Sequence, residues 1–432
     1  MGKKIISPGG NVSGVLELPG DKSISHRYAM LAALAEDTSE IANYSTAEDC
    51  RSTLDCLRRL GAGIEIGPDK VRISGRGLQG LKSPRNALDA ENSGTTMRLL
   101  MGILAGQSFA CKLTGDASLR RRPMRRIIEP LRQMGAEIES SDGDRAPIEI
   151  RGGHLHAIDY TLPIPSAQVK SAILLAGLFA DGITTVREPI RTRDHTELAL
   201  REFGADVVAA NRKVSVHPKP SLHARQLVVP GDLSAAVFFI CAALILPGSS
   251  LVLHNVGLNP TRTRILDFLI SMGASIHLAA VQMHDSELVG DISVQYSPLM
   301  GGKISGGIVA EMIDELPMLA AIGPYTEKGI EMRDAQELRV KESDRIAALA
   351  TGLREMGARV EEFPDGIHVA GRGAGKLHGV SLEPCGDHRI AMALSIAALG
   401  ADGKTAILDA KCVGVSFPGF FESLEKLRGK SS

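Results

Sequence analysis

Polar and charged side chains gather immediately before an apolar run near the start of the sequence. Residues 21–27, "DKSISHR", carry six of them, and the run "YAMLAALA" follows at once. A run that is apolar on every side predicts a helix buried in a core, which puts the polar cluster at the N-terminus of that helix. Helix N-termini carry free N–H groups and the positive end of the helix dipole, so they bind anions. The cluster therefore predicts an anion-binding site.

Similar junctions recur further along the chain. Small or polar residues precede apolar runs in "ENSGTTMR" (91–98), "PSAQVK" (165–170) and "CGDHR" (385–389). Further Arg and Lys residues are concentrated in "SLRRRPMRR" (118–126), "RTRD" (191–194) and "RVKESDR" (339–345). Taken singly, each segment is typical of a solvated surface or of ion pairs between helix neighbours. Their repetition in a chain of net charge −1 indicates instead a small polyanionic ligand, because Arg forks match carboxylate and phosphate groups and Lys adds a compact charge.

Carboxylates accompany two of these places. Asp314 and Glu315 open the segment "DELPMLAAIG", where acids ordinarily cap a helix. Glu342 and Asp344 lie between Lys341 and Arg345, where a network of surface ion pairs is the ordinary explanation. If one acid from each place reached the same cation-bound ligand, the two could act as base and acid in proton transfer. Both explanations stay open on the sequence alone.

One structural unit repeats along the chain. The end of an amphipathic helix, a glycine and then β-forming residues recur in "LRRLGAGIEI", "LRQMGAEIES", "LREFGADVVA", "LISMGASIHL" and "LREMGARVEE". Their glycines, at 61, 135, 204, 273 and 357, are 69 to 84 residues apart, and Gly429 in "FESLEKLRGK" marks a sixth copy. A glycine after a periodic apolar segment is a helix stop. The elements of each unit follow the order βαβαββ, although the pattern does not fix which element comes first. This order predicts an α/β (α+β) fold with six repeats.

The repeats divide into two halves. "LELPGDKS" (16–23) and "LVVPGDLS" (227–234) are nearly the same phrase, 211 residues apart. The sixth copy ends without its trailing strands, whereas "KIIS" and "GVLEL" are spare strands near the N-terminus. Because exposed sheet edges are usually covered, we expect residues 1–20 plus 231–432 to form one domain of three repeats. Residues 21–230 would form the other, with the active site in the cleft between them.

Composition excludes several classes of protein. Charge is balanced, aromatic residues are 3% of the chain and Trp is absent, which argues against nucleic-acid binding. The six Cys are scattered without a CxxC pair, and the longest apolar run, 235–246, is too short to cross a bilayer. "HLH" (154–156) is a weak metal motif with no third ligand nearby. We expect a soluble cytoplasmic protein without a metal, a cofactor or a membrane partner.

Six ordered motifs resemble those of the 5-enolpyruvylshikimate-3-phosphate (EPSP) synthase family: "PGDKSISHR", "NSGTTMR", "RRRPM", "PSAQVKSA", "RVKESDR" and "GDHRIAMALSIAAL". The resemblance implies a two-domain enolpyruvyl transferase-like fold, three βαβαββ repeats per domain, that closes on its substrates. It implies transfer of the enolpyruvyl group of phosphoenolpyruvate to the 5-hydroxyl of shikimate 3-phosphate, with release of phosphate, in the shikimate pathway to chorismate and the aromatic amino acids. The expected protein is a monomer that needs no cofactor.

The resemblance also implies site residues. Shikimate 3-phosphate would be bound by Lys22, Ser23, Arg27, Ser166, Ala167, Gln168, Arg193, Asp314 and Lys341. Phosphoenolpyruvate would be bound by Lys22, Gly94, Arg122, Gln168, Arg345 and Arg389. Asp314 would be the base for the 5-hydroxyl and Glu342 the acid for the methylene carbon, and Lys22 would assist catalysis. Leu99 and Val415 depart from the commoner family pattern. This departure resembles a second, divergent bacterial group of the family, and it leaves inhibition by glyphosate undecided.

Two other functions are compatible with the same fold. A UDP-N-acetylglucosamine enolpyruvyl transferase would carry Lys-Asn in the first motif and a reactive Cys in a mobile loop. Here the pair is Lys22-Ser23, and Cys111 lies in the strand-like "SFACKLTG". A non-catalytic anion-binding protein would be expected to have lost its acid and base, whereas Asp314 and Glu342 are both present.

Overall fold

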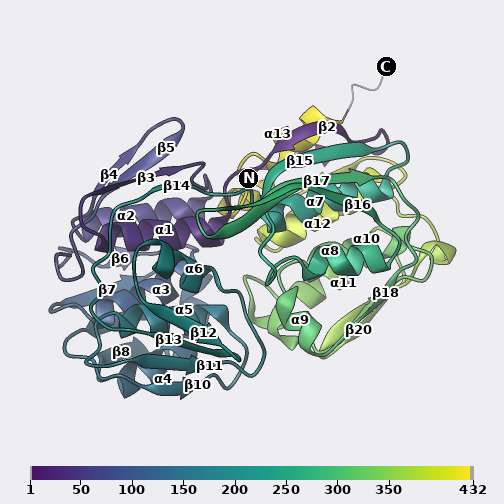
Figure 1. Ribbon diagram of the computed structural model, residues 1–432. Helices are drawn as coiled ribbons and strands as arrows, with labels where there is room; N and C mark the ends of the chain where they lie inside the picture. The colour runs from purple at the N-terminus through teal and green to yellow at the C-terminus, as the bar shows by residue number, and fades with distance from the viewer. Residues whose placement is uncertain (1, 429–432) are drawn as a thin grey trace. The chain divides into compact units, whose positions relative to one another are not determined.

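The computed structural model describes residues 2–428, and these fold into two compact units (Figure 1). Of the described residues, unit 1 takes 2–19, 230–283 and 288–428, and unit 2 takes 20–229 and 284–287. No helix in this part of the chain is long and apolar enough to cross a membrane.

Unit 2 contains three four-stranded sheets of one design, in which two parallel strands are followed by an antiparallel hairpin. Their strand orders are β14(Gln226–Val228)-β3(Thr38–Ala42)-β5(Lys70–Ser74)-β4(Gly63–Ile66), β6(Leu88–Asp89)-β7(Ala110–Thr114)-β9(Arg145–Arg151)-β8(Glu137–Ser141) and β10(Asp159–Thr161)-β11(Thr184–Arg187)-β13(Lys213–Val216)-β12(Val207–Ala210). The second and third sheets each belong to one βαβαββ repeat, because a helix follows each of their first two strands. In the first sheet, β14 comes from the end of the unit and pairs with β3 of the first repeat.

The helices of unit 2 form an inner and an outer set. The inner helices are α1(Lys22–Leu34), α3(Gly94–Ala105) and α5(Ala167–Gly177), and the outer ones are α2(Glu48–Arg59), α4(Arg125–Gln133) and α6(His195–Glu202), with η1(Leu119–Arg121) before α4. The inner helices are rich in Ala, Leu and Ile, are buried on nearly all sides and pack on one another. The outer helices are amphipathic and bury one face. The expected buried helices therefore form the core of the unit.

Unit 1 repeats this design. Its sheets have the orders β2(Ser13–Glu17)-β15(Ser250–Gly257)-β17(Glu287–Gln295)-β16(Ser275–His284), β18(Gly302–Ile304)-β19(Ile330–Met332)-β21(Gly366–Val369)-β20(Val360–Phe363) and β22(Ser381–Leu382)-β23(Thr405–Ile407)-β1(Lys4–Ile6). Its helices are α7(Leu233–Ile245), α8(Arg264–Ser271), α9(Gly307–Glu311), α10(Leu316–Ile322), α11(Arg345–Glu355), α12(His388–Leu399) and α13(Phe420–Leu427), with η2(Gly323–Tyr325), η3(Gln336–Val340), η4(Arg372–Ala374) and η5(Ala410–Val415). The inner set is α7, α10 and α12. The α/β fold expected from the sequence is confirmed.

The two N-terminal strands join different sheets. Strand β1 pairs antiparallel with β23, so it adds the third strand of the last sheet. Strand β2 pairs parallel with β15 and leads the first repeat of unit 1. Each strand thus takes a place that the repeat pattern leaves empty in unit 1.

The repeated Pro-Gly-Asp phrase marks two of the places where the chain passes between units; the others flank residues 284–287. Strand β2 of unit 1 leads through Gly20 to α1 of unit 2, and β14 of unit 2 leads through Gly231 to α7 of unit 1. A Cβ atom on Gly20 would lie 1.9 Å from the carbonyl oxygen of Asn43. Glycine is therefore required there for steric reasons.

The glycines that end the outer helices have the backbone expected of helix stops. Five of them have φ between 92° and 102°: Gly61, Gly135, Gly204, Gly273 and Gly357. L-residues with side chains rarely adopt this left-handed conformation, which is why glycine recurs after helices. Gly429 of the sixth copy lies outside the described residues.

Candidate active site

The N-terminus of α1 presents a cation and a buried guanidinium. Asp21 caps the helix, because its carboxylate accepts a hydrogen bond from the N–H of Ile24 at 2.9 Å. Lys22 donates to Asp49 of α2 at 2.8 Å and is partly exposed. Arg27 donates to the carbonyl oxygen of Ser23 at 2.8 Å. These contacts fix the first turn of α1 and its cations in place.

Arg27 ties α1 to the other repeats of unit 2. Its Nε donates to Thr196 Oγ1 at 2.6 Å and its Nη2 to Ser171 Oγ at 2.9 Å. Burial, against the opposing effect of Glu197 and with a smaller contribution from the nearby cation of Arg193, lowers the pKa of Arg27 to about 10. Arg27 stays charged at neutral pH, so Arg27 and Arg193 form a pair of neighbouring cations.

Two of the six polar residues in 21–27 have structural roles. Ser25 accepts a hydrogen bond from the N–H of Ser45 at 3.0 Å, and His26 shares one with Thr53 at 2.6 Å. Burial, together with the cation of Lys22, lowers the pKa of His26 well below its usual value. His26 is therefore a neutral core residue.

The N-termini of α3 and α5 are joined by side-chain hydrogen bonds. Ser166 caps α5, and Ala167 and Gln168 form its first turn. Arg98 of α3 donates to Gln168 Oε1 at 2.6 Å, and Gln168 Nε2 donates to Thr95 Oγ1 at 3.0 Å. The amide of Gln168 is thus held in one orientation at the start of both helices.

Gly94 starts α3 beneath two guanidinium groups. Ser93 caps this helix, since its hydroxyl accepts from the N–H of Thr96 at 3.1 Å. A Cβ atom on Gly94 would lie 3.1 Å from Arg98 Nη1 and 3.2 Å from Arg122 Nη1. Arg122 is buried and donates to Asn92 Oδ1 at 3.3 Å. A helix N-terminus with two guanidinium groups above it is suited to phosphate or carboxylate.

A buried ion-pair triad holds the segment that carries Arg193. Lys170 Nζ lies 3.1 Å from Glu188 Oε2 and 2.7 Å from Glu197 Oε1, and the three side chains are 1–3% exposed. Glu188 also accepts the N–H of Thr192 at 3.1 Å. The backbone on the N-terminal side of Arg193 is thereby fixed to α5.

The tip of the β16–β17 hairpin, residues 284–287, completes unit 2. Glu287 Oε1 lies 2.6 Å from Nδ1 of His195, and both side chains are buried. Tyr28 donates to the carbonyl oxygen of Asp285 at 3.2 Å, and Ser286 donates to Glu202 at 2.6 Å. The sequence analysis did not identify this tip, because "HDSE" reads as an ordinary polar turn.

Arg345 organises the site residues of unit 1. It is 1% exposed, and its Nε donates to Asp387 Oδ2 at 2.8 Å while its Nη2 donates to Glu342 Oε2 at 2.6 Å. Its Nη1 lies 3.8 Å from Asp314 Oδ1. Although burial opposes the charge, the carboxylates of Asp387 and Glu342 raise the pKa of Arg345 above its ordinary value. One guanidinium therefore lies beside both carboxylates that the sequence marked for proton transfer.

Two further cations of this region lie on either side of Arg345 in the sequence, Lys341 before it and Arg389 after it. Arg389 Nη1 donates to the carbonyl oxygen of Asp314 at 2.7 Å, and Lys341 is half-buried at the end of η3. Asp387 caps α12 by accepting the N–H of Arg389 at 2.9 Å. Asp387 is fully buried, and although burial opposes the shift, the cation of Arg345 holds its pKa below the usual value.

Other acids of these segments have structural roles. Asp344 caps α11 and pairs with Arg339 at 2.7 Å, as the surface explanation expected. Glu315 is buried, accepts a hydrogen bond from Ser234 and lies 3.6 Å from Arg262. The sequence analysis missed Asp387, although "GDHR" before an apolar run is a recognisable cap signal.

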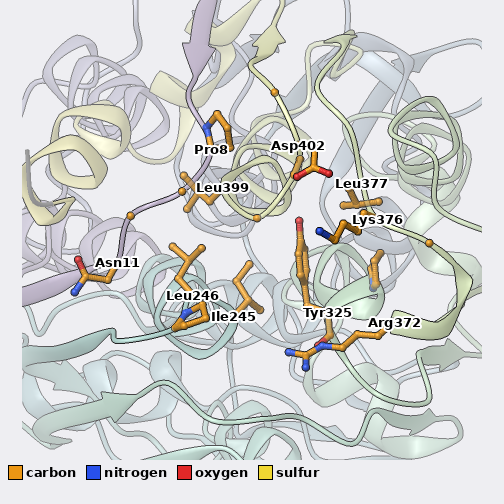
Figure 2. Close-up of a pocket in the computed structure, with 18 residues that line it drawn as sticks. Pro8, Asn11, Ile245, Leu246, Tyr325, Arg372, Lys376, Leu377, Leu399 and Asp402 are labelled. Atoms are coloured by element: carbon orange, nitrogen blue, oxygen red, sulfur yellow. The ribbon is translucent and has the colours of Figure 1, made fainter. Parts of the chain in front are cut away.

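A cavity of about 1020 Å³ in unit 1 contains none of these residues. Figure 2 shows Ile245, Leu246 and Leu399 on one side of it, and Tyr325 and Arg372 on the other. It lies at the C-terminal ends of α7 and α12, whereas the predicted anion-binding residues lie at helix starts. Because C-terminal helix ends carry negative partial charge, this cavity is not a candidate for the substrate site.

Solved structures share this fold. The EPSP synthase of Acinetobacter baumannii is 42% identical, with a TM-score of 0.87 over 99% of this chain and 98% of its own. The enolpyruvyl transferase NikO of Streptomyces tendae is 20% identical, with a TM-score of 0.77 over 98% of this chain and 96% of its own, a likeness of fold alone. Two units of three repeats with cations at helix starts define an enolpyruvyl transferase.

The family follows from the sequence match. The model of EPSP synthase (3-phosphoshikimate 1-carboxyvinyltransferase) matches residues 6–424. A protein of that name from Solibacter usitatus (strain Ellin6076) is 53% identical over 98% of this chain and 99% of its own. The chain belongs to the EPSP synthase family and is a transferase of the shikimate pathway. The predictions of family, fold class and reaction are confirmed, and the two alternative functions are set aside.

Proposed function

We propose that the two groups of site residues act on the same pair of substrates in the EPSP synthase reaction. The observation that carries this proposal is that the buried guanidinium of Arg345 lies beside both Asp314 and Glu342, in a segment rich in cations. Proton transfer at two atoms of one reacting pair needs two carboxyl groups in one place. Residues of unit 2 then bind the anionic groups of the substrates.

Shikimate 3-phosphate would be bound mainly by cations and hydroxyls of unit 2. Lys22 and Ser23 lie in the first turn of α1 and Arg27 in the second, and the cation of Arg193 is near Arg27. The α5 start supplies Ser166, Ala167 and Gln168, with the free N–H groups of its first turn. Asp314 and Lys341 of unit 1 would contact the ring.

Phosphoenolpyruvate would be bound by guanidinium groups from both units. Gly94 lets Arg122 approach the start of α3, and Lys22 and Gln168 lie at neighbouring helix starts. Arg345 and Arg389 would take the other anionic group. Bidentate Arg contacts suit phosphate and carboxylate alike, and binding two anions side by side requires this excess of cations.

The proposed chemistry is addition followed by elimination. Asp314 accepts the proton of the 5-hydroxyl while the hydroxyl oxygen forms a bond to C2 of phosphoenolpyruvate. Glu342 delivers a proton to the methylene carbon. The tetrahedral intermediate carries its charge among the Arg and Lys groups. In the elimination, Glu342 takes a proton back from the methyl group as the C2–O bond to phosphate breaks. Phosphate leaves with the proton that Asp314 had accepted, and the double bond of the product is restored.

Release of inorganic phosphate tests this function directly. We expect release only when phosphoenolpyruvate and shikimate 3-phosphate are both present, and none when either is omitted. Replacing shikimate 3-phosphate by UDP-N-acetylglucosamine should also give none. Phosphate release that does not depend on shikimate 3-phosphate would contradict the proposal.

Replacement of Gly94 by alanine tests the site at the start of α3. The new methyl group must displace the ends of Arg98 and Arg122, so charge-assisted contacts worth about 1.5–3 kcal/mol weaken. We expect the KM for phosphoenolpyruvate to rise at least about tenfold, with a smaller change in the KM for shikimate 3-phosphate. Gly373→Ala is the control, because nothing lies within 4 Å of its Cβ position. Equal increases in both KM values would assign Gly94 a general structural role.

Replacement of Glu287 by alanine tests the hairpin tip. Buried His195 would lose its carboxylate partner, at a cost of about 1.5–3 kcal/mol, and the segment of Arg193 would lose support. We expect the KM for shikimate 3-phosphate to rise several-fold with kcat less affected. Asp291→Asn is the control, because Asp291 lies on the same strand as Glu287, is half-buried and pairs with His254 instead of His195. An unchanged KM would show that the tip serves stability alone.

We also propose that the enzyme acts as a monomer in the cytoplasm. Every residue that the proposed site requires is supplied by one chain, so assembly is not needed for catalysis. The six cysteines are free in the structure, which suits a compartment where thiols stay reduced. Size-exclusion chromatography with light scattering measures the oligomeric state, and a stable dimer would contradict this proposal.

A further inference from the structure

We propose that unit 2 carries a second site, a surface site for a divalent transition metal formed by His154, His156 and Asp181. No third ligand lies near "HLH" in the sequence, so the third residue of this group could not be identified from the motif alone. Asp181 is distant in the sequence, but the fold brings its carboxylate beside the two imidazoles. One ligand atom from each of the three residues lies within 4.8 Å of the other two.

The backbone of the site is fixed by buried contacts. Leu155 is fully buried between the two histidines and forms a parallel bridge with Ala180. In extended backbone, side chains two residues apart point to the same side, and the rings of His154 and His156 lie 5.5 Å apart. The N–H of Asp181 donates to the carbonyl oxygen of Leu155 at 3.0 Å. All three ligands therefore project from one anchored pair of segments.

The side chains are already arranged around Asp181. Its Oδ2 lies 2.9 Å from Nδ1 of His156, and its Oδ1 accepts the N–H of Ala157 at 2.9 Å. Hydrogen bonds from His156 and Ala157 lower the pKa of Asp181, so it is a carboxylate at neutral pH. All three side chains are exposed, so small rotations can bring the donor atoms to metal–ligand distances of about 2.0–2.2 Å.

The donor set selects the kind of metal. Two imidazole nitrogens and one carboxylate oxygen suit Zn²⁺, Co²⁺, Ni²⁺ or Cu²⁺, whereas Mg²⁺ and Ca²⁺ prefer oxygen ligands alone. Water would fill the remaining coordination positions, as the exposure of the site allows. Asp181 follows the C-terminal end of α5, while the substrate residues lie at its start, and the eleven-residue helix is about 16 Å long. We therefore expect metal binding to leave the transferase reaction unaffected.

Titration of the full chain, without an affinity tag and after treatment with a chelator, tests the site. We expect one equivalent of Zn²⁺ to bind by calorimetry, and Co²⁺ to give a visible d–d absorption band in the same protein. His154→Ala and Asp181→Asn should each weaken Zn²⁺ binding at least about tenfold, because each substitution removes one ligand of the metal. Asparagine is chosen because it can still accept the hydrogen bond from Ala157.

His254→Ala is the matched control. His254 is a half-buried histidine whose Nδ1 lies 2.9 Å from Asp291 Oδ2, but it belongs to no such three-residue cluster among the described residues. This variant should bind Zn²⁺ like the unaltered chain. Weak binding without a defined stoichiometry, or binding that survives both His154→Ala and Asp181→Asn, would overturn the proposal. Phosphate release by every variant confirms that each one is folded.

Discussion

Replacement of Glu342 by glutamine is expected to lower kcat by about 10²- to 10⁴-fold, the range typical of a lost general acid. The amide keeps the shape of the side chain and can still accept the hydrogen bond that Arg345 donates to Glu342 at 2.6 Å. It cannot deliver a proton to carbon. Binding of shikimate 3-phosphate should therefore persist, and calorimetry can measure it in a chain that has no Trp for fluorescence.

Two companion variants locate the effect. Asp314→Ala should lose a comparable share of turnover, because the base for the 5-hydroxyl would be missing. Glu362→Gln is the control, since Glu362 pairs with Arg339 at 3.0 Å on the exposed side of the same repeat. Near-normal turnover in both Glu342→Gln and Asp314→Ala would remove these carboxylates from the mechanism.

Replacement of Arg345 by methionine is expected to reduce the free energy of unfolding by about 3–5 kcal/mol, because it leaves the buried carboxylate of Asp387 without its cation. Asp387 is fully buried and Glu342 would lose the same partner. Arg354→Met, on the same helix, is the control. Arg354 is 46% exposed and lies 3.8 Å from Glu362, and such surface pairs contribute about 0–1 kcal/mol.

Urea unfolding followed by circular dichroism gives this difference. A double variant, Arg345→Met with Asp387→Asn, should recover part of the lost stability, because the uncompensated charge is removed as well. Equal stability of Arg345→Met and Arg354→Met would contradict the central place given to Arg345. A double variant less stable than Arg345→Met would show that Asp387 acts through the cap of α12 instead.

The repeated units could be predicted because each is specified by local signals. A helix that is apolar on every side, an amphipathic helix and a glycine stop act within a few residues of one another, and they recur with a regular spacing. Gly61 and Gly204 are examples of such local signals, because the turn at each glycine itself requires a left-handed φ. The pairing of β1 with β23 could be anticipated only because the repeat pattern leaves a sheet short of strands.

Local patterns and ordered motifs were sufficient to predict the class of fold and the family, which the comparisons confirm. Which charged side chains lie next to one another is visible only in the folded chain. Asp387 is 42 residues from Arg345, Glu287 is 92 residues from His195, and Asp181 is 25 residues from His156. No local pattern relates such residues, because their contact depends on how helices and sheets pack. For the buried pairs of Arg345 with Asp387 and of His195 with Glu287, the low dielectric of the interior also strengthens the interaction.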